Sequence, residues 1–425
     1  MSEPSLYQPL GNHLKVARNG TTQSQVQFPT EYPVTRIETI ADGTINYGKI
    51  GHLAAPADGY ELQPGDILYS HINSIKHVGK VAQYWGEEKF LYHGMNLLLL
   101  RLDDEVDKRY FFHFLNSYNA RHYAQKECQK AINQVSLNTG QLKKLSVFTP
   151  PMVEQQVIAH ILDTLDTQIR QTEALIAKLE QIKQGLLTDL LTRGIDENGE
   201  LRPPPEQAPH LYKDSALGRI PRGWDVLPVV ELGEIVTGTT PPSSIPRAWG
   251  SELPFITPAD VGHSDSITTA ERSLSAVGKS YVREIPPGTT LVVCIGSTIG
   301  KVGFCGVPAA TNQQINALIP SQKLNRTFMY HAVQRHVRQI LAWAGLQAVP
   351  IVNKTQFGQM LLPIAPSQEQ FAVARRLSVA ERQIMEERAI FSKLGQLKAS
   401  LMNDLLTGRV RVTPLLNEAG EQATG

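Results

Sequence analysis

The chain has 425 residues and a formal net charge of only +1, with 41% hydrophobic and 19% charged residues. This length predicts two or more domains, and no apolar run is long enough to span a bilayer. The near-neutral charge counts mildly against nucleic-acid binding, so such a site would have to arise from local charge. The polar first residues do not resemble a signal peptide, and three cysteines without paired spacing argue against zinc or disulfide scaffolds, so a cytoplasmic location fits.

Residues 1–150 are expected to form a first mixed α/β domain. Short β-like runs at 66–72 and 97–102 are bounded by turn residues, and a helix-like stretch follows at 108–127. Between Lys108 and Lys144 the sequence has seven Lys or Arg residues and one acid, Glu127. Such a stretch is suited to contact DNA phosphates, which fixes the register on a duplex without reading its sequence. A solvated helix face or a protein contact is the alternative.

Residues 151–194 predict one long helix. Apolar residues recur there at alternating three- and four-residue steps, which is typical of helices paired as a coiled coil. Pro151 precedes the helix and Gly194 follows it, as expected for its two ends. A core helix of a compact bundle is the alternative. The apolar seam consists of Leu162, Leu165, Ile169, Ile176, Leu179 and Leu186.

The second half of the chain repeats this organisation after a proline-rich polar segment, 195–222, which is expected to be a linker. Residues 223–365 predict a second mixed domain, with a β-like run at 289–295. From Lys323 to Lys354 there are five Lys or Arg residues and no acid. A second long helix is predicted within 366–410, and residues 411–425 form a C-terminal tail. The second seam consists of Leu377, Ile384, Phe391, Leu394 and Leu401.

An internal repeat relates the two halves. Residues 137–192 match 352–407 without a gap, each position recurring 215 residues later, as in Asn138 and Asn353 or Glu154 and Glu369. If the two seams pair in an antiparallel arrangement, the chain has pseudo-two-fold symmetry. Helices with a length of about 55–60 Å would then hold the two domains apart. The predicted fold is therefore α+β, with two repeated mixed domains separated by an antiparallel coiled coil of two long helices.

No catalytic or nucleotide-binding motif is found in the sequence. The run GSTIGKV at 296–302 resembles a phosphate-binding loop, but Val302 stands where a magnesium-binding Ser or Thr is required. We therefore expect no catalytic residue, metal or cofactor in this chain.

Turn-rich polar segments in both halves offer side chains that can read base edges, since Arg and Lys suit guanine and Asn and Gln suit adenine. For any single residue, ordinary loop polarity is the competing interpretation. The candidate DNA-binding residues are Thr35, Arg36, Asn46, Lys49, Asn73, Lys76 and Lys80 in the first half, and Thr239, Thr240, Arg247, Thr257, Lys279, Lys301, Asn312 and Gln313 in the second.

Several motifs together resemble the specificity subunit of type I restriction–modification systems. They include VTRIETIADGTINYGKIG (34–51), LQPGDILYSHIN (62–73), VEQQVIAHILDTLDTQI (153–169) and GLLTDLLTRGID (185–196) in the first half. The second half adds KDSALGRIPRGWDV (213–226), ITPADVG (256–262) and PSQEQ (366–370). The resemblance covers nearly the whole chain, although the first half has no counterpart of GRIPRGW.

The resemblance implies that each mixed domain is a target-recognition domain that reads one half of a bipartite, asymmetric DNA site. The seam residues of both helices would then pair with each other and bind partners. Those partners would be two methyltransferase subunits, which use S-adenosylmethionine to methylate adenine, and restriction subunits that use ATP and magnesium. This chain would be a non-catalytic subunit without cofactors of its own.

Two other classes of function stay open at this point. The chain could be an autonomous nuclease or methyltransferase with cryptic motifs, which would modify DNA without partners. It could also be a coiled-coil interaction scaffold, or a DNA-binding protein without restriction–modification partners.

Overall fold

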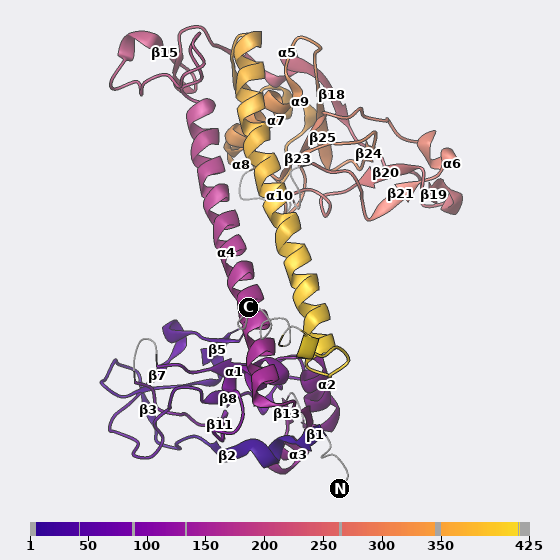
Figure 1. Cartoon of the computed structure of the whole chain (residues 1–425). Helices are drawn as coiled ribbons and strands as arrows, with labels where there is room; N and C mark the ends of the chain where they lie inside the picture. Colours follow the sequence, from indigo (N-terminus) through magenta and orange to yellow (C-terminus); the bar gives the residue numbers. More distant parts are fainter. Residues whose placement is uncertain are drawn as a thin grey trace. The chain divides into compact units, whose positions relative to one another are not determined.

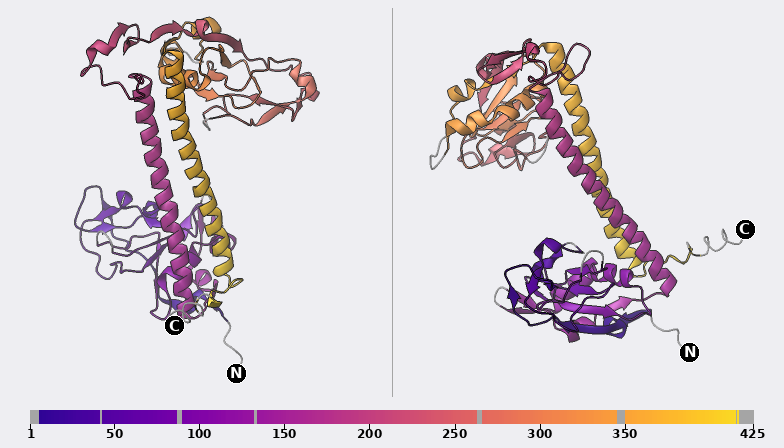
Figure 2. Two further views of the ribbon diagram at one scale, coloured as in Figure 1. Left: turned by 45° about the horizontal axis from the view of Figure 1, so that its top comes forward. Right: turned by 90° about the vertical axis from the view of Figure 1, so that its left-hand side faces the viewer.

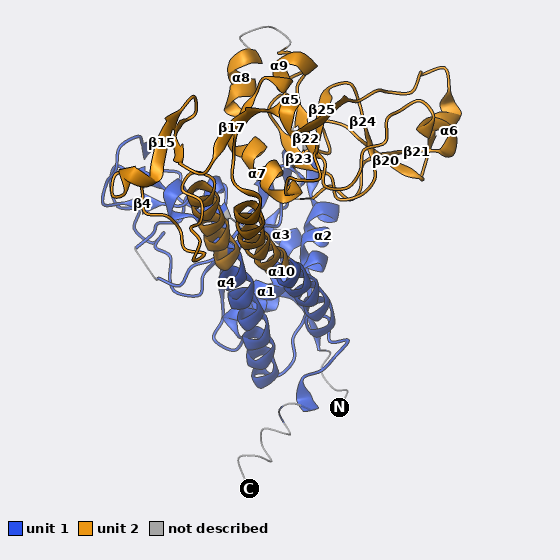
Figure 3. Cartoon of the chain, turned by 90° about the horizontal axis from the view of Figure 1, so that it is seen from above, with its two compact units in different colours: residues 1–173, 389–425 blue, residues 174–388 orange. Residues whose placement is uncertain are grey.

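The computed structural model describes residues 6–41, 43–86, 90–131, 134–262, 266–344, 350–414 and 416. The chain folds as two compact units, residues 1–173 with 389–425 (unit 1) and residues 174–388 (unit 2) (Figure 3). Each unit contains one mixed domain and half of each long helix, α4 (Met152–Leu190) and α10 (Ser367–Leu405) (Figure 1). Both predicted long helices are therefore present, at 39 residues each. No helix in the described ranges is long and apolar enough to cross a membrane.

The mixed domain of unit 1 is built on a four-stranded antiparallel sheet in the order β10-β8-β11-β2. Its elements are β1 (Tyr7–Pro9), η1 (Leu10–His13), β2 (Leu14–Asn19), β3 (Gln25–Val26), β4 (Pro33–Val34), η2 (Ile37–Thr39), β5 (Ile40–Ala41), β6 (Thr44–Ile45), η3 (Tyr47–Lys49), β7 (Gly51–Leu53), β8 (Ile67–Tyr69), β9 (Ile72–Asn73), β10 (Val81–Gln83), β11 (Leu98–Leu102), α1 (Lys108–Leu115), α2 (Tyr118–Glu127), β12 (Gln129–Ala131), β13 (Gln134–Ser136), α3 (Thr139–Lys143) and β14 (Ser146–Phe148).

The apolar run of β11 explains why this sheet is covered on both faces. Successive side chains of a strand point to opposite faces. Leu98 and Leu100 pack with Tyr110 of α1, whereas Leu99 packs with Leu68 of β8 in a second cluster. A strand in which successive positions are apolar, as at Leu98, Leu99 and Leu100, is stable only between two covering layers.

Unit 2 has an equivalent sheet in the order β18-β25-β22-β23. Its elements are η4 (Pro209–Leu211), β15 (Tyr212–Ser215), β16 (Gly218–Pro221), β17 (Asp225–Pro228), α5 (Val229–Leu232), β18 (Gly233–Thr237), η5 (Pro246–Ala248), β19 (Trp249–Gly250), β20 (Leu253–Ile256), β21 (Arg272–Leu274), α6 (Ala276–Lys279), β22 (Thr290–Val293), β23 (Val302–Phe304), β24 (Ala310–Thr311), β25 (Ile315–Pro320), α7 (Arg326–His336), α8 (Arg338–Ala344), α9 (Lys354–Gly358) and β26 (Leu361–Ile364).

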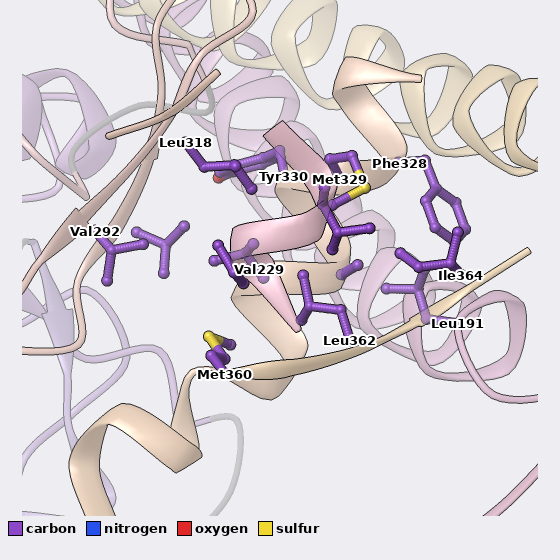
Figure 4. Packing of buried hydrophobic residues seen from close by; sticks show 14 of the residues in the cluster. Leu191, Val229, Val292, Leu318, Phe328, Met329, Tyr330, Met360, Leu362 and Ile364 are labelled. Atoms are coloured by element: carbon purple, nitrogen blue, oxygen red, sulfur yellow. The ribbon is translucent and has the colours of Figure 1, made fainter. Parts of the chain in front are cut away.

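The largest core of unit 2 lies between its sheet, α7 and the long helices. Figure 4 shows Leu318 of β25, Phe328 of α7 and Leu362 of β26 in this core, together with Leu191 just after α4. The end of α4 is thus part of the unit 2 core.

Within each unit the two long helices lie side by side and run antiparallel (Figures 1 and 2). In unit 2, Glu180 pairs with Arg388 at 2.6 Å and Lys183 with Glu381 at 3.0 Å, so residue numbers rise along one helix as they fall along the other. In unit 1, Lys398 pairs with Asp166. The buried helix residues recur at equivalent positions: Ile158, Ala159, Leu162, Leu405 and Leu406 in unit 1, and Val373, Ala374, Leu377, Leu190 and Leu191 in unit 2.

The repeated Glu-Gln pairs fasten the start of each long helix to its mixed domain. Gln155 accepts a hydrogen bond from the Asp107 N–H at 2.9 Å and donates one to the Pro150 carbonyl at 2.8 Å. Gln370 makes the same two contacts, to Asn325 and Ala365, at 2.9 and 2.8 Å. Both bonded N–H groups belong to N-cap residues, of α1 and α7. The repeat is therefore conserved in three dimensions as well as in sequence.

The glutamates of these pairs bind an arginine that follows the other long helix. Glu154 holds Arg411 through two bonds of 2.9 and 2.5 Å, and Glu369 holds Arg202 through two bonds of 3.0 and 2.5 Å. We call the ion pair of Glu154 and Arg411 the clamp of unit 1, and the ion pair of Glu369 and Arg202 the clamp of unit 2. Gly194 has a left-handed φ of 64°, and a Cβ there would lie 2.1 Å from Glu369 Oε1. Only glycine fits this approach.

The segment expected to be a linker, 195–222, carries regular structure in unit 2. It contains the hairpin of β15 and β16, and Ile195 and Ile220 are buried in the unit 2 core. A few apolar side chains anchor a segment whose overall composition is proline-rich and polar. Val412 of the expected tail is likewise buried in unit 1, and residues 417–425 lie outside the described residues.

Candidate nucleic-acid interface

One end of each four-stranded sheet gathers three connecting loops. In unit 2, the last residue of β18, Thr237, lies opposite Asn316 near the start of β25, and Val293 at the end of β22 lies opposite Ile315. Because neighbouring strands are antiparallel, the chain leaves or enters the sheet at this end in each case. We call residues 238–240, 294–301 and 311–314 the loop edge of unit 2.

The equivalent loops of unit 1 come from strands with the same pairing. Asn19 at the end of β2 lies opposite Leu98 at the start of β11, which in turn lies opposite Tyr69 at the end of β8. Residues 20–22, 70–80 and 93–96 therefore form the loop edge of unit 1.

Polar side chains fix the loop edge of unit 2. Thr240 donates a hydrogen bond to Gln313 Oε1 at 2.7 Å, and Asn312 donates one to Gln314 Oε1 at 2.9 Å. The backbones also touch, since a Cβ on Gly238 would lie 2.2 Å from the Asn312 carbonyl oxygen. These contacts connect the loop after β18 to the loop before β25.

The loop edge of unit 1 uses the same backbone contact with different side chains. A Cβ on Gly20 would lie 2.1 Å from the Gly94 carbonyl oxygen, and the Thr21 N–H donates to the His93 carbonyl at 2.9 Å. Beyond this contact, Met95 is 50% exposed, and Asn96 has a left-handed φ of 73°. Burial lowers the pKa of the His93 imidazole to about 4, so this ring is neutral at pH 7.

Of the candidates in unit 1, Asn73, Lys76 and Lys80 lie on the loop edge. Asn73 donates to Ser70 Oγ at 3.1 Å, and Lys76 is exposed. Thr35 requires a correction, because its side chain is fully buried and accepts a hydrogen bond from the Gly94 N–H at 2.9 Å. It positions a loop and cannot reach a base.

The other three unit 1 candidates lie on the segment from η2 to η3. Arg36 is exposed beside Glu38 at 3.6 Å, Asn46 caps η3 by accepting from the Gly48 N–H at 3.0 Å, and Lys49 is exposed.

Five of the eight unit 2 candidates lie on the loop edge, namely Thr239, Thr240, Lys301, Asn312 and Gln313. The other three lie elsewhere. Thr257 donates to the Asp260 carboxylate at 2.8 Å, which stabilises its own turn. Arg247 lies on η5, and Lys279 at the end of α6 is 3.6 Å from Glu284.

Sequence reasoning missed Thr22, Met95 and Asn96 in unit 1. The match between NGTT (19–22) and TGTT (237–240) carries the signal, because the same 218-residue offset places 93–96 on 311–314. The polar composition of TNQQIN (311–316) suggests contact with DNA, whereas HGMN (93–96) is less polar and does not stand out.

Part of each basic stretch is used to attach the mixed domain to a long helix. Arg109 donates to Asp163 at 2.7 Å and His113 contacts the same carboxylate at 2.9 Å, while His331 lies 3.3 Å from Glu381. Burial by itself raises the pKa of the Asp163 carboxyl, but the bonds and charges of His113 and Arg109 hold it below its ordinary value. The lysines left exposed in the first stretch are Lys126, Lys130, Lys143 and Lys144.

Comparison with known proteins decides the family. The model of the type I restriction modification DNA specificity domain matches residues 10–181 and again residues 221–391. The putative type I restriction enzyme MjaX specificity subunit of Methanocaldococcus jannaschii is 32% identical over 416 residues, which span 94% of this chain and 92% of that protein. This chain belongs to the type I restriction–modification DNA specificity family.

A second specificity subunit is similar in sequence, and a solved structure shares the fold. The HindI specificity subunit of Haemophilus influenzae is 29% identical over 199 residues, covering 45% of this chain and 42% of its own length. A crystal structure of the type I restriction–modification S subunit from M. genitalium has a TM-score of 0.59 over 94% of this chain and 95% of that chain, at 15% identity. The resemblance and the α+β fold expected from the sequence are thus confirmed.

The long helices of this specificity-family chain bury their predicted seam to different extents. Four seam residues are fully or almost fully buried, namely Leu162, Leu165, Leu377 and Ile384. The others are half-buried, namely Ile169, Ile176, Leu179, Leu186, Phe391, Leu394 and Leu401.

Next to the seam lie large apolar side chains that the long helices leave exposed. Leu175 is 40% and Ile182 is 52% exposed on α4, and the positions 215 residues later, Ile390 and Leu397 on α10, are 46% and 48% exposed. On each long helix the two exposed aliphatic residues lie two helical turns apart. Such exposed apolar surfaces favour association.

The described residues contain no group of three or more His, Cys, Asp or Glu side chains arranged to hold a metal. The run 296–302 lies between β22 and β23 and ends on the first residue of β23, whereas a phosphate-binding loop precedes a helix. Burial raises the pKa of the Cys294 and Cys305 thiols to about 11, which makes both poor nucleophiles.

Proposed function

We propose that this chain is the non-catalytic DNA-specificity subunit of a type I restriction–modification complex and reads a bipartite, asymmetric target. The observation that carries the proposal is the presence of two loop edges on equivalent sheets. Both are assembled through the same glycine contact, at Gly20 and Gly238. Each edge presents polar side chains that can contact base edges and at least one lysine that can contact phosphates, Lys76 in unit 1 and Lys301 in unit 2.

The two loop edges carry different residues at equivalent positions, which supports an asymmetric target. Met95 and Asn96 of unit 1 correspond to Gln313 and Gln314 of unit 2. Side chains with different donors and acceptors favour different bases, so the two domains would read different half-sites.

The paired helices would set the distance between the half-sites. Each has 39 residues, and at about 1.5 Å per residue this corresponds to about 58 Å. Their equal length follows from the gapless repeat, so both domains are joined to the helices in the same way.

The exposed aliphatic residues of the long helices support docking of two copies of one partner. Leu175 and Ile182 on α4 have equivalents in Ile390 and Leu397 on α10, so a surface that fits one copy recurs for a second. We assign these surfaces to two methyltransferase subunits, with restriction subunits joining the assembly. S-adenosylmethionine, ATP and magnesium would be bound by those partners.

Exchange of one mixed domain tests the proposal. Residues 1–150 are replaced by the corresponding domain of another specificity subunit, the chain is produced with its methyltransferase subunit, and methylated adenines are mapped across a genome. One half-site should change while the other half-site and the spacer stay the same. The chain alone should modify no DNA.

Other outcomes would favour the competing functions. Modification of DNA by the purified chain without partners would indicate an enzyme. Absence of any sequence-specific duplex binding with the methyltransferase subunit present would indicate a coiled-coil scaffold.

A further inference from the structure

The loops before β11 and β25 occupy the same structural position in the two units. Each begins beside the glycine that directly follows β2 or β18, so that Gly20 lies against Gly94 and Gly238 lies against Asn312. Each then enters the central strand, in which Leu98 or Asn316 lies opposite the last residue of β2 or β18. In this register Met95 and Gln313 occupy equivalent positions relative to the two sheets.

Both loops are hydrogen-bonded at their base and exposed at Met95 and Gln313. Thr35 accepts a bond from the Gly94 N–H at 2.9 Å in unit 1, and the Asn312 N–H donates to the Ile256 carbonyl at 3.3 Å in unit 2. Met95 and Gln313 themselves are exposed. A side chain that reads a base must be held in this way, because a loose side chain does not discriminate.

We propose that Met95 and Gln313 are equivalent specificity-determining residues, each selecting one base in the half-site of its own domain. The proposal rests on the proposed function above, and it adds which side chains decide the sequence.

The chemistry of the two side chains predicts which bases they favour. The amide of Gln313, oriented by Thr240 at 2.7 Å, offers the donor and acceptor pair that matches the N7 and N6 of adenine. Met95 has no N–H or O–H group and presents an apolar thioether, which suits contact with the methyl group of thymine. The two half-sites should therefore differ at this position, with adenine read by unit 2 and thymine by unit 1.

Lysines at the same loop edges are placed to contact phosphates next to the base that is read. Lys76 lies on the loop between β8 and β10, and Lys301 on the loop between β22 and β23. Phosphate contacts position the protein and carry no sequence information. Substituting one of these lysines therefore serves as a control for substitutions at Met95 and Gln313.

Reciprocal substitutions test the inference. Met95→Gln and Gln313→Met are made in the full chain, assembled with its methyltransferase subunit, and binding to a randomised duplex library is sequenced. Met95→Gln should shift one position of the first half-site from thymine to adenine, with a change in preference of about ten- to a hundredfold. Gln313→Met should produce the reverse shift in the second half-site. In each variant the other half-site should be unchanged.

Two control variants separate base reading from other roles. Lys76→Ala should weaken binding to all sequences alike and reduce the salt dependence of binding by about one phosphate contact. Met95→Leu keeps an apolar side chain and should retain the thymine preference, which tests the residue even if Met95→Gln were to unfold the loop.

Two results would overturn the inference. One is a Met95→Gln complex with the wild-type base preference, and the other is an equal loss of affinity for every sequence. If the wild-type complex itself selects no bipartite sequence, the proposed function fails instead, so the two failures are distinguishable.

Discussion

Lys398 of α10 donates a hydrogen bond to Asp166 of α4 in unit 1, and the same two repeat positions meet in unit 2 with their helices exchanged. There the lysine is Lys183 of α4, 3.0 Å from Glu381 of α10. Each unit therefore uses the acid of one repeat and the lysine of the other. This relationship explains why the repeats have equal length, since a residue inserted in one helix would displace both pairs.

Removing the lysine of either pair should destabilise its unit. Lys398→Ala or Lys183→Ala leaves a half-buried carboxylate without its cation, and we expect a loss of about 1–3 kcal/mol in the free energy of unfolding. Thermal or urea unfolding followed by circular dichroism measures the change. Lys393→Ala and Lys178→Ala are the matched controls, because both lysines are exposed on the same helices. Equal losses in the controls would contradict a role for the pairs.

The clamp of unit 1 should hold the residues that follow α10. Glu154→Ala removes both acceptors of Arg411, so the segment that buries Val412 should detach at a cost of about 2 kcal/mol. Hydrogen exchange or limited proteolysis should show faster attack after Gly408 in this variant. Glu197→Ala, an exposed acid in the segment after α4, is the control. Unchanged protection in Glu154→Ala would show that the clamp is dispensable.

Much of this architecture is predictable from the sequence because repeats and apolar periodicity are local signals. The gapless match and the seam of Leu162, Leu165 and Ile169 predict two paired long helices, which the structure contains. The contacts of Gln155 and Gln370 lie outside such reasoning, because they depend on N-cap residues 48 and 45 positions away. The repeat identifies the two glutamines without saying what they bind.

The candidate interface was less predictable for a physical reason. Polarity suggests contact with DNA. However, the hydroxyl of Thr35 accepts a hydrogen bond from a backbone N–H, and the hydroxyl of Thr257 donates one to Asp260. Met95 carries no polar signal. Its equivalence to Gln313 is suggested by the match of NGTT to TGTT and is established by the pairing of the strands in the two sheets. Base-reading positions depend on which loops share a sheet end, and composition does not contain that information.

The buried imidazole of His93, on the unit 1 loop edge, should make unit 1 less stable in mild acid. The folded pKa of His93, about 4, lies below its ordinary value near 6.5, so its stabilising contribution is complete above about pH 6.5 and lost as the pH falls towards 4. Between pH 7 and pH 5 we expect a loss of about 2 kcal/mol from this group. Urea unfolding at the two pH values measures it.

A His93→Asn variant controls for other titrating groups. Its loss between pH 7 and pH 5 should be smaller than that of the wild type by about 2 kcal/mol, while half-buried His336, with a pKa of about 4, still titrates in unit 2. An identical pH dependence in both proteins would rule out His93 as the cause.

The equivalence of the two units predicts that a half-length chain assembles with itself. In a chain of residues 1–208, Leu190 and Leu191 of one copy can replace Leu405 and Leu406 against the domain of the other. Arg202 can likewise replace Arg411 on Glu154. Light scattering after gel filtration should give twice the mass of the half-chain. Leu190→Asp combined with Leu191→Asp should abolish the dimer, and a folded monomer of the unaltered half-chain would contradict the equivalence.

The spacing between half-sites shows directly whether the paired helices set the distance between the two domains. One heptad is inserted between Glu173 and Ala174 and the same heptad at the equivalent point between Arg388 and Ala389, which keeps the seam in register and lengthens both helices by about 10 Å. Methylated adenines are then mapped for the complex. We expect unchanged half-sites separated by a spacer longer by about three base pairs. An unchanged spacer, or altered half-sites, would contradict it.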